Sequence, residues 1–374
     1  MTKFCVHSQT GISIVDAAGY IRPCCKFKDT SSLPKIDQVD TLNNIHQQEP
    51  FKSIRRSLNK GIFPAGCREC ARQETAGIQS RRQETNKMYG KHNLFIPTYI
   101  QDMEFALDYT CNMMCRMCNP GASSKWGAAH SVIEKFKQHD IDLDTETGYK
   151  DYQDRIKEVL EKTDLSHARH IKIEGGEPFY AKHFEWFIDK LDREVIDKRK
   201  LFLNITTNGS VYPDERIIKK LQSFNTTIAF SIDAHGALAE CLRWGVSWNT
   251  IEENIKRFKT ETHFNLFTNI TVSILNFNAM YPLVRFCDSI GLRTSFNELT
   301  HPEYLSIYQL PLSVREQFKI GIEQFDTLLL VDTTVEPEFD KLLKSIDILD
   351  QYHNTDFAQI NGEVLGVINA NIGK

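Results

Sequence analysis

The hydrophobic and polar residues of this chain alternate with two different periods. Between Tyr99 and Leu299, short apolar runs typical of buried strands are separated by stretches whose apolar residues recur as on one face of a helix. The expected strands are 103–110, 169–174, 201–206, 227–232, 267–275 and 293–298. Strands that alternate with helices indicate a parallel sheet with helical crossovers. The predicted fold class is therefore α/β, a partial (β/α)6 TIM-like barrel.

The segments on either side of this alternation have other patterns. Residues 4–25 read as a β-hairpin, and the polar stretch 71–91 reads as one connecting helix. Beyond the barrel, two helical stripes cover 314–329 and 339–349, and we interpret them as packing helices. These changes divide the chain into three predicted domains, namely an N-terminal cysteine-containing module over 1–97, the barrel over 98–300 and a C-terminal helical region over 301–374.

Charge and hydropathy exclude some classes of function. The 374 residues include 45 Lys and Arg and 49 Asp and Glu, so the formal net charge is −4. This balance argues against a chain built mainly to bind nucleic acid or anionic lipid. The N-terminus lacks the apolar segment of a signal peptide, and no apolar stretch is long enough to span a bilayer. We therefore expect a cytoplasmic protein with neither membrane nor nucleic acid as partner.

Eight of the ten cysteines are clustered. Because cytoplasmic thiols stay reduced, clustered cysteines bind metal or do redox chemistry more often than they form disulfides. Cys111, Cys115 and Cys118 follow the first barrel strand, at the end of the sheet where active sites lie. Three thiolates in a short loop can hold three irons of a [4Fe–4S] cluster and leave the fourth open to another ligand. The isolated Cys241 and Cys287 read as buried small hydrophobic residues.

The spacing Cys-x3-Cys-x2-Cys after a first βα strand resembles the signature of radical S-adenosylmethionine (SAM) enzymes. A second segment supports the resemblance. The second predicted strand ends at Glu174, and Gly175-Gly176-Glu177-Pro178 follows it directly. This segment is similar to the GGEP motif of that family. Glycines let a backbone approach a ligand closely, and a carboxylate binds an ammonium group. The resemblance implies that this turn contacts the methionine amino group of SAM.

The resemblance also implies SAM contacts in the cysteine loop and after the later strands. These are Met117 before the third cysteine, then Asn208, Ser231, Asp233 and Arg243, with Asn276 as a weaker candidate. At the position of Met117 the family often has an aromatic residue, which acts partly through its backbone. The implied activity is reductive cleavage of SAM to methionine and a 5′-deoxyadenosyl radical that abstracts a hydrogen atom from substrate. The implied partner is an electron donor such as a flavodoxin or ferredoxin.

The N-terminal cysteines carry a second resemblance. Cys5, Cys24, Cys67 and Cys70 are arranged as in the twitch module, the shortened relative of the SPASM domain, which holds an auxiliary [4Fe–4S] cluster. Such modules commonly follow the barrel, whereas this one precedes it. Cys25 is an alternative to Cys24 as ligand, and four thiolates can equally bind zinc.

The two resemblances together imply a reaction class. An auxiliary cluster with four thiolate ligands implies an electron acceptor or relay, and hence net oxidation or bond formation on the substrate. Relatives with such modules often act on peptides or proteins, so a peptide or protein substrate is expected. Two alternatives stay open: radical SAM modification of RNA or a small molecule, and a non-catalytic iron–sulfur or zinc protein. The sequence identifies no catalytic acid or base.

Overall fold

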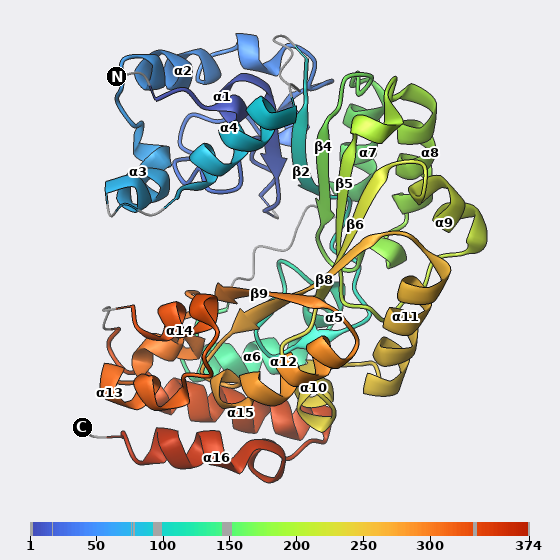
Figure 1. Ribbon diagram of the computed structural model, residues 1–374. Coiled ribbons are helices and arrows are strands. Elements are labelled where there is room, and N and C mark those ends of the chain that lie inside the picture. Colours follow the sequence, from blue (N-terminus) through green and yellow to red (C-terminus); the bar gives the residue numbers. More distant parts are fainter. Residues whose placement is uncertain are drawn as a thin grey trace. The chain divides into compact units, whose positions relative to one another are not determined.

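The computed structural model describes residues 3–16, 18–75, 77, 79–92, 99–143, 152–331 and 335–372 (Figure 1). The chain forms two compact units, which we describe one at a time. Unit 1 consists of Met1–Thr110, Glu146–Thr206 and Pro213–Thr227, and unit 2 of Cys111–Thr145, Thr207–Tyr212 and Ile228–Lys374. A seven-stranded parallel sheet has the strand order β1-β2-β4-β5-β6-β8-β9. The predicted α/β class and TIM-like partial barrel are confirmed.

Unit 1 contains the first strands of the sheet and the helices that cover them. The strands are β1 (Gly11–Ile14), β2 (Asp102–Ala106), β4 (His170–Glu174) and β5 (Phe202–Thr207), paired in parallel in that order. The helices that follow β2, β4 and β5 are α7 (Tyr152–Glu161), α8 (Phe184–Glu194) and α9 (Glu215–Leu221). The apolar stripe of α8 packs on the sheet, and the ring centroids of Phe105 and Phe187 lie 5.0 Å apart. Glu104 and Lys172 alternate with such core residues, so they point to the other face.

The hairpin predicted over residues 4–25 is only partly correct. Val6–Thr10 form helix α1, and β1 joins the main sheet parallel to β2. Among the described residues, one antiparallel bridge, between Ser13 and Arg22, matches the expected hairpin. All four residues of β1 are buried, which suits a strand covered on both faces better than a half-exposed hairpin.

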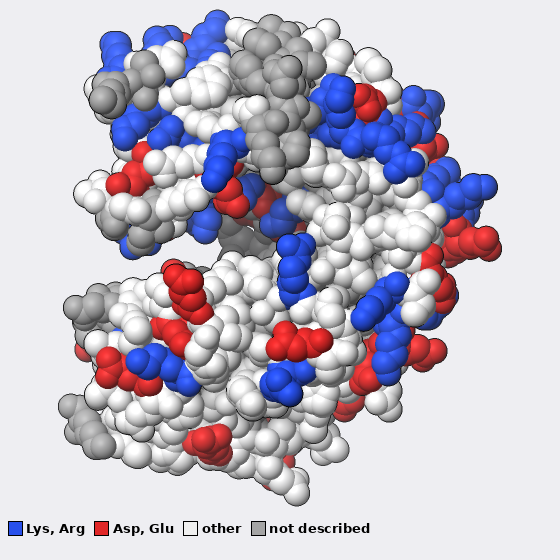
Figure 2. Space-filling model, viewed as in Figure 1, with Lys and Arg blue, Asp and Glu red and all other residues white. Residues whose placement is uncertain are grey.

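Three helices complete the N-terminal part of unit 1, namely α2 (Phe51–Asn59), α3 (Arg68–Thr75) and α4 (Arg81–His92). The single helix predicted over 71–91 is interrupted between α3 and α4. Gly77 has a φ of +73°, which a right-handed helix does not contain. Ser80 then caps α4, because its Oγ accepts a hydrogen bond from Gln83 N–H and Gln83 Oε1 accepts one from Ser80 N–H. Lys and Arg side chains gather over this part of the chain (Figure 2).

Unit 2 contains β8 (Asn265–Val272) and β9 (Arg293–Glu298), which pair in parallel. A separate antiparallel pair joins β3 (Met114–Cys115) to β7 (Arg243–Trp244). Between β5 and β8 in the sheet order comes β6 (Asn225–Ser231). The helices of unit 2 are α5 (Ser124–Gly127), α6 (His130–Gln138), α10 (Ala237–Leu242), α11 (Trp248–Glu261), α12 (Met280–Ser289), α13 (Leu312–Arg315), α14 (Glu323–Leu329), α15 (Phe339–His353) and α16 (Phe357–Asn369).

Short 3₁₀ turns connect many of these elements. In the described residues they lie at Ile36–Gln38, Ile45–Gln47, Ala65–Cys67, Pro178–Tyr180, Lys198–Lys200, Phe277–Ala279, Glu303–Leu305, Ile307–Gln309 and Glu316–Phe318. No described helix is both long enough and apolar enough to cross a membrane.

The C-terminal helices differ in part from the sequence pattern. The stripe predicted over 314–329 is divided into α13 and α14, and Gly321 between them has a φ of +80°. The stripe over 339–349 is confirmed as part of α15. The tail, which carries little pattern, forms α16, and Asn361 at its kink donates a hydrogen bond to the Leu275 carbonyl at 3.0 Å. The domain boundaries at 97/98 and 300/301 stay predictions, and the first falls among residues 93–98, outside the described part.

Candidate functional site

Cys111, Cys115 and Cys118 lie in one loop of unit 2 that neighbouring elements hold in place. The middle of the loop forms β3, and its pairing with β7 sets Cys115 opposite Arg243. The indole N–H of Trp126, in α5, donates a hydrogen bond to the Cys115 carbonyl at 2.8 Å. Cys118 N–H donates to the same carbonyl at 3.1 Å, so the loop turns between its second and third cysteines. Backbone contacts thus fix the positions from which the three thiols project.

The three thiols influence one another, with Cys115 buried and Cys111 and Cys118 half-buried. Burial, together with the neighbouring thiol of Cys111, raises the pKa of Cys118 to about 11. Burial also raises the pKa of Cys115, and the other two thiols act in the same direction. Met113 N–H donates a hydrogen bond to Cys111 Sγ at 3.5 Å. Each thiolate disfavours ionisation of the other thiols through charge repulsion. A bound metal centre offsets this repulsion and favours the deprotonated thiols, so the loop fits the ligand set of a three-cysteine cluster.

Arg243 adds a fixed positive charge to this loop. Its Nη1 lies 3.8 Å from Cys115 Sγ. Its Nε and Nη2 reach one carboxylate oxygen of Asp233 at 2.7 and 2.6 Å, and the other oxygen accepts a hydrogen bond from Thr271 N–H at 2.7 Å. Burial alone would lower the pKa of Arg243, but Asp233 and Cys115 raise it above its ordinary value. The guanidinium therefore stays charged beside the loop, a position suited to an anionic set of ligands.

A group of polar side chains ties the cysteine loop to the residues after β5. Asn208 Nδ2 donates to Asn112 Oδ1 at 3.0 Å, and Asn112 Nδ2 donates to Ser210 Oγ at 2.9 Å. Asn208 Oδ1 also accepts a hydrogen bond from Ser210 N–H at 2.9 Å. Asn112 directly follows Cys111. The predicted SAM contact Asn208 therefore orients the cysteine loop, a role that no sequence signal indicates because Asn112 and Ser210 carry no motif.

The remaining candidates of unit 2 lie at strand ends or in the loop. Asn276 is fully buried, and its Nδ2 donates to the carbonyls of Asp233 and Thr271, both at 2.9 Å. It thus shapes the backbone that presents the Asp233 carboxylate to Arg243. Ser231 ends β6, and Met117 lies in the cysteine loop; both side chains are half-buried. Whether they contact SAM stays a prediction.

The predicted GGEP-like turn follows β4 in unit 1. Gly176 N–H donates to the Asp108 carbonyl at 3.2 Å, and Glu177 N–H donates to the Thr110 carbonyl at 2.8 Å. Gly175 has a φ of +125°. A methyl group at position 176 would lie 2.2 Å from the Thr110 oxygen. Both glycines are therefore needed for the turn to lie against the segment that leads directly into Cys111.

The carboxylate of this turn is held in a fixed orientation. Glu177 is fully buried, and its Oε1 accepts a hydrogen bond from Phe179 N–H at 3.1 Å. Pro178 is buried as the first residue of a 3₁₀ turn, where its missing N–H costs nothing. A buried carboxylate of fixed orientation is suited to bind the ammonium group of an amino acid.

Replacing Gly176 by alanine will weaken SAM binding. The new methyl group cannot be accommodated by a flexible side chain, because the atom it meets belongs to the backbone of Thr110. We expect the dissociation constant of labelled SAM, measured on the iron-reconstituted protein, to rise at least about tenfold, or ~1.4 kcal/mol. Gly362→Ala in α16 is the matched control, since nothing lies within 4 Å of its added methyl group. Equal SAM affinity in both variants would show that the turn does not bind SAM.

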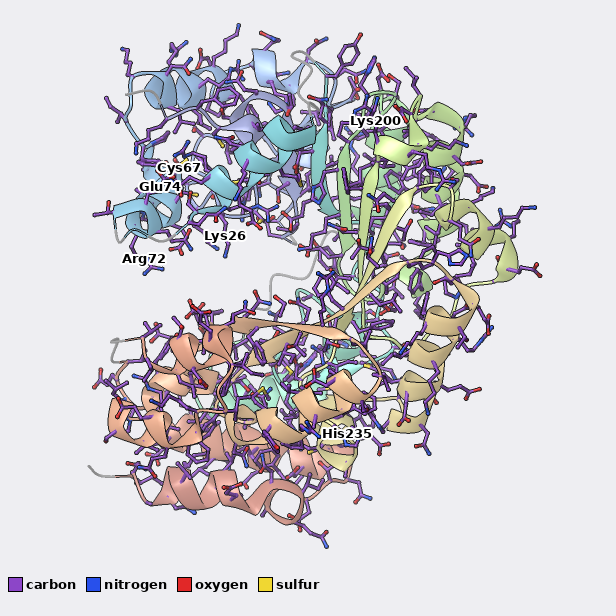
Figure 3. All side chains as sticks on the ribbon, viewed as in Figure 1. Lys26, Cys67, Arg72, Glu74, Lys200 and His235 are labelled. Carbon is purple, nitrogen blue, oxygen red and sulfur yellow. The ribbon has the colours of Figure 1, made fainter. Side chains whose placement is uncertain are left out.

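Four of the five N-terminal cysteines form a second group, in unit 1. After burial, the thiols of Cys25, Cys5 and Cys67 raise the pKa of Cys24, and those of Cys5 and Cys70 raise the pKa of Cys67. Burial raises the pKa of Cys5 to about 11 and that of Cys67 to about 12. Figure 3 shows Cys67 beside α3. These mutual effects on ionisation indicate that the four thiols proposed from the sequence as auxiliary ligands lie in one neighbourhood.

Two cysteines of this group lie at the starts of helices. Cys5 immediately precedes α1, and Cys70 lies in the first turn of α3. Cys67 follows Gly66, where a methyl group would lie 2.3 Å from the ring of buried Phe27. Cys5 and Cys67 also pack against the apolar cluster that contains Phe27. Among the described residues, no three His, Cys, Asp or Glu side chains are placed to hold a single metal ion.

Cys25 belongs to a different environment from Cys24. Its thiol shares a hydrogen bond with Glu104, and burial raises its pKa to about 12. Lys172 Nζ lies 2.7 Å from Glu104 and 2.6 Å from Glu174, so these residues form a charged group on the face of β2 and β4. Cys25 is part of that group, whereas Cys24 is influenced by Cys5 and Cys67 in addition to Cys25. The influence of Cys5 and Cys67 favours Cys24 over Cys25 as the auxiliary ligand.

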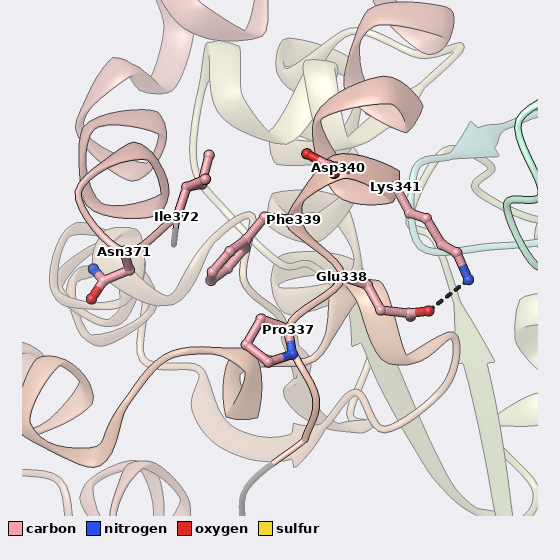
Figure 4. Close-up of a pocket in the computed structure, with 7 residues that line it drawn as sticks. All are labelled: Pro337, Glu338, Phe339, Asp340, Lys341, Asn371 and Ile372. Atoms are coloured by element: carbon pink, nitrogen blue, oxygen red, sulfur yellow. Dashed lines mark hydrogen bonds and ion pairs between the residues drawn. The ribbon is translucent and has the colours of Figure 1, made fainter. Parts of the chain in front are cut away.

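A pocket of about 490 Å³ lies in unit 2 (Figure 4). It is lined by Pro337, Glu338, Phe339, Asp340, Lys341, Asn371 and Ile372. Glu338 and Lys341 form an ion pair of 2.6 Å at its wall. None of the predicted site residues lines this pocket, so we do not assign it to SAM.

Comparison with known families agrees with the geometry of the cysteine loop. Residues 109–286 match the model of the radical SAM superfamily. The matched range contains the cysteine loop, the GGEP-like turn and the Asp233–Arg243 pair. The resemblance to radical SAM enzymes read from the sequence is therefore supported by a family model over this part of the chain. No curated protein is significantly similar to the chain.

Two solved structures illustrate what the chain is similar to. One is native anSMEcpe with bound AdoMet and Cp18Cys peptide, with 17% identity and a TM-score of 0.39, covering 57% of this chain and 55% of that chain. Another is Streptococcus suis SuiB bound to precursor peptide SuiA, with 16% identity and a TM-score of 0.36, covering 77% of this chain and 64% of that chain. The chain spans about half the length of the anSMEcpe structures it matches.

Proposed function

We propose that this protein is an enzyme that cleaves SAM reductively and uses the resulting radical on a substrate. The observation that carries the proposal is the buried loop of Cys111, Cys115 and Cys118, with Arg243 at 3.8 Å from Cys115 Sγ, inside the residues that match the family. These three thiols would hold a [4Fe–4S] cluster. When bound, that cluster supplies the electron that splits SAM into methionine and a 5′-deoxyadenosyl radical able to abstract a hydrogen atom.

The residues in and around the cysteine loop would hold the cluster ligands in place and keep water away from them. Arg243 offsets the negative charge of the thiolates, and Asp233 and Thr271 keep the guanidinium in place. The backbone N–H of Met113, directed at Cys111 Sγ, is the kind of sulfur hydrogen bond that tunes a cluster potential. Trp126 of α5 and Met113 of the loop are both fully buried, and they exclude water from the loop.

The residues of the GGEP-like turn serve to orient SAM. The buried Glu177 carboxylate is suited to the methionine ammonium group, and the two glycines leave room for its approach. The turn is itself held in place, because Glu177 N–H donates a hydrogen bond to the Thr110 carbonyl at 2.8 Å.

We extend the proposal to a second [4Fe–4S] cluster on Cys5, Cys24, Cys67 and Cys70. The mutual influence of these thiols on their ionisation supports it. Four protein ligands leave no iron for substrate, so the expected role is electron transfer. This role suits net oxidation or bond formation, and the twitch resemblance suggests a peptide or protein as substrate.

The proposal is tested by anaerobic reconstitution followed by chemical analysis. We expect about eight irons per chain, and 5′-deoxyadenosine and methionine in equal amounts after addition of SAM and dithionite. Addition of candidate peptides should then raise the rate of 5′-deoxyadenosine formation. Zinc without iron, or the absence of SAM binding to the reconstituted protein, would refute the enzyme assignment.

Replacing Cys67 and Cys70 by alanine will remove about half of the iron and leave about four irons per chain. The loss is confined to the auxiliary site because these thiols interact with Cys5 and Cys24 and belong to unit 1. SAM cleavage without substrate should persist. Cys25→Ala is the matched control and should keep all the iron, because its thiol bonds to Glu104. Full iron in the double variant, or loss of iron in the control, would move the auxiliary ligands elsewhere.

A further inference from the structure

The charge of the chain is unevenly distributed. Residues 1–97 contain 15 Lys and Arg but 8 Asp and Glu, a formal net charge of +7, although the whole chain carries −4. The remaining residues therefore carry −11. Lys and Arg predominate over the part of unit 1 that holds α2, α3 and α4 (Figure 2). A local basic surface thus exists on a chain whose overall balance is acidic.

This positive charge lies around the auxiliary cysteines. Arg68 directly follows Cys67, and Arg72 is one turn further along α3; both side chains are exposed. Lys28 N–H donates a hydrogen bond to the Gly66 carbonyl at 3.1 Å, which brings a second exposed basic segment, including Lys26, to the same place. Figure 3 shows Lys26 and Arg72 projecting from the part of the chain that holds Cys67.

Two large apolar side chains lie next to the same cysteines and are exposed to solvent. Phe4, which precedes Cys5, is 39% exposed, and Ile62 is 59% exposed. Their segments are adjacent, because Lys3 N–H donates to the Leu58 carbonyl and Ile62 N–H to the Ser57 carbonyl. An exposed apolar centre with a charged rim is the usual composition of a protein-binding surface. We call the surface of Lys26, Lys28, Arg68, Arg72, Phe4 and Ile62 the module face.

We propose that the module face docks an acidic protein that carries single electrons, a proposal that rests on the two-cluster function above. Electron-transfer complexes use small interfaces, and charge complementarity steers them together and speeds association. Cys5, Cys24 and Cys67, the half-buried thiols of the auxiliary group, lie beneath this face. Each carrier molecule gives up one electron and each SAM that is cleaved takes one, so the exchange balances.

An acidic residue beside the module face favours a protein over RNA. Glu69, whose side chain is 30% exposed, pairs with Arg72 at 3.0 Å. A carboxylate among the basic residues repels a uniformly anionic phosphate backbone, whereas a protein partner, although acidic overall, can place a basic residue opposite it. The exposed Ile62 offers no ring for base stacking. Binding of RNA in place of a protein is one of the alternatives that the following experiment distinguishes.

The experiment uses the full-length reconstituted protein, a purified flavodoxin as the acidic carrier, and the double variant Lys26→Glu/Arg72→Glu. We expect its flavodoxin dissociation constant at 50 mM salt to rise at least about tenfold, and flavodoxin-supported SAM cleavage at subsaturating carrier to fall by a similar factor. Cleavage driven by dithionite should not change. Lys200→Glu is the matched control, because Lys200 is an exposed basic residue of unit 1 far along the chain from the cysteines (Figure 3). Ile62→Ser should weaken binding without altering the salt dependence.

The outcomes separate this proposal from the enzyme assignment. If the wild-type protein makes no 5′-deoxyadenosine with dithionite, the proposed function fails, while flavodoxin binding still tests the module face. Equal flavodoxin affinity of the double variant and wild type would overturn the docking proposal. A loss as large in Lys200→Glu would overturn it too, because the effect would then reflect net charge alone. Tight binding of a transfer RNA that the double variant loses, without flavodoxin binding, would assign the face to RNA.

Discussion

The simultaneous replacement of Cys111, Cys115 and Cys118 by alanine will abolish 5′-deoxyadenosine formation. The variant removes every proposed thiolate ligand of the SAM-binding cluster, so neither the electron nor the binding site for SAM remains. Because Cys5, Cys24, Cys67 and Cys70 belong to unit 1 and the triplet belongs to unit 2, the auxiliary iron should be retained. We expect about four irons per chain and no product above background, measured by iron analysis and liquid chromatography after dithionite reduction.

The matched control for this variant is Cys287→Ala. Cys287 is fully buried, and its Sγ lies 3.5 Å from Thr268 Oγ1, which makes it a packing residue of α12. The control should keep all the iron and the full rate of SAM cleavage. Continued formation of 5′-deoxyadenosine by the triple variant would refute the assignment of the triplet, whatever the iron content.

The periodic part of the fold follows from the sequence because burial imposes the pattern. Each expected barrel strand overlaps a strand of the structure, and 293–298 coincides with β9. Because helices cover these strands, the strand residues that face the core are apolar. The apolar runs can therefore be recognised in the sequence without knowing which strands pair with each other. The run 103–110 ends earlier in the structure, at Ala106, because the residues before Cys111 turn to accept hydrogen bonds from Gly176 and Glu177.

Structural features that depend on contacts between residues distant in the sequence cannot be predicted from a local sequence pattern. The run Gly11–Ile14 has the composition of either a hairpin strand or a sheet strand, and its pairing with Asp102–Phe105 decides between them. In the same way, Cys24 and Cys25 are neighbours of identical chemistry. The nearby thiol of Cys5 and the carboxylate of Glu104 distinguish them, and both belong to the fold.

The same limit applies to the candidate site. The spacing of the three cysteines and the two glycines could be read directly, because each acts through local backbone geometry. The role of Asn208 could not, because it depends on Asn112. Asp233 and Arg243 were expected as two separate SAM contacts. The structure shows them as one ion pair beside Cys115, which changes the experiment that tests them.

Replacing Arg243 by methionine will destabilise the protein strongly. The Asp233 side chain is 0% and the Arg243 side chain 14% exposed, so the variant leaves a buried carboxylate with no cation of its own. Removal of one partner from a buried pair typically costs about 3–5 kcal/mol. We expect a loss of this size in the free energy of unfolding, measured by chemical denaturation of protein without iron. The reconstituted variant should also hold less iron, because the positive charge beside Cys115 is lost.

The double variant Asp233→Leu/Arg243→Met separates stability from function. Removing both partners leaves no unpaired buried charge, and such replacements are often neutral or stabilising. Most of the lost stability should therefore return. SAM cleavage should not return, because the cation beside Cys115 Sγ is still missing and the Asp233 carboxylate no longer accepts the hydrogen bond from Thr271 N–H. If the double variant recovers activity together with stability, the pair supports the fold alone and Arg243 has no role at the cysteine loop.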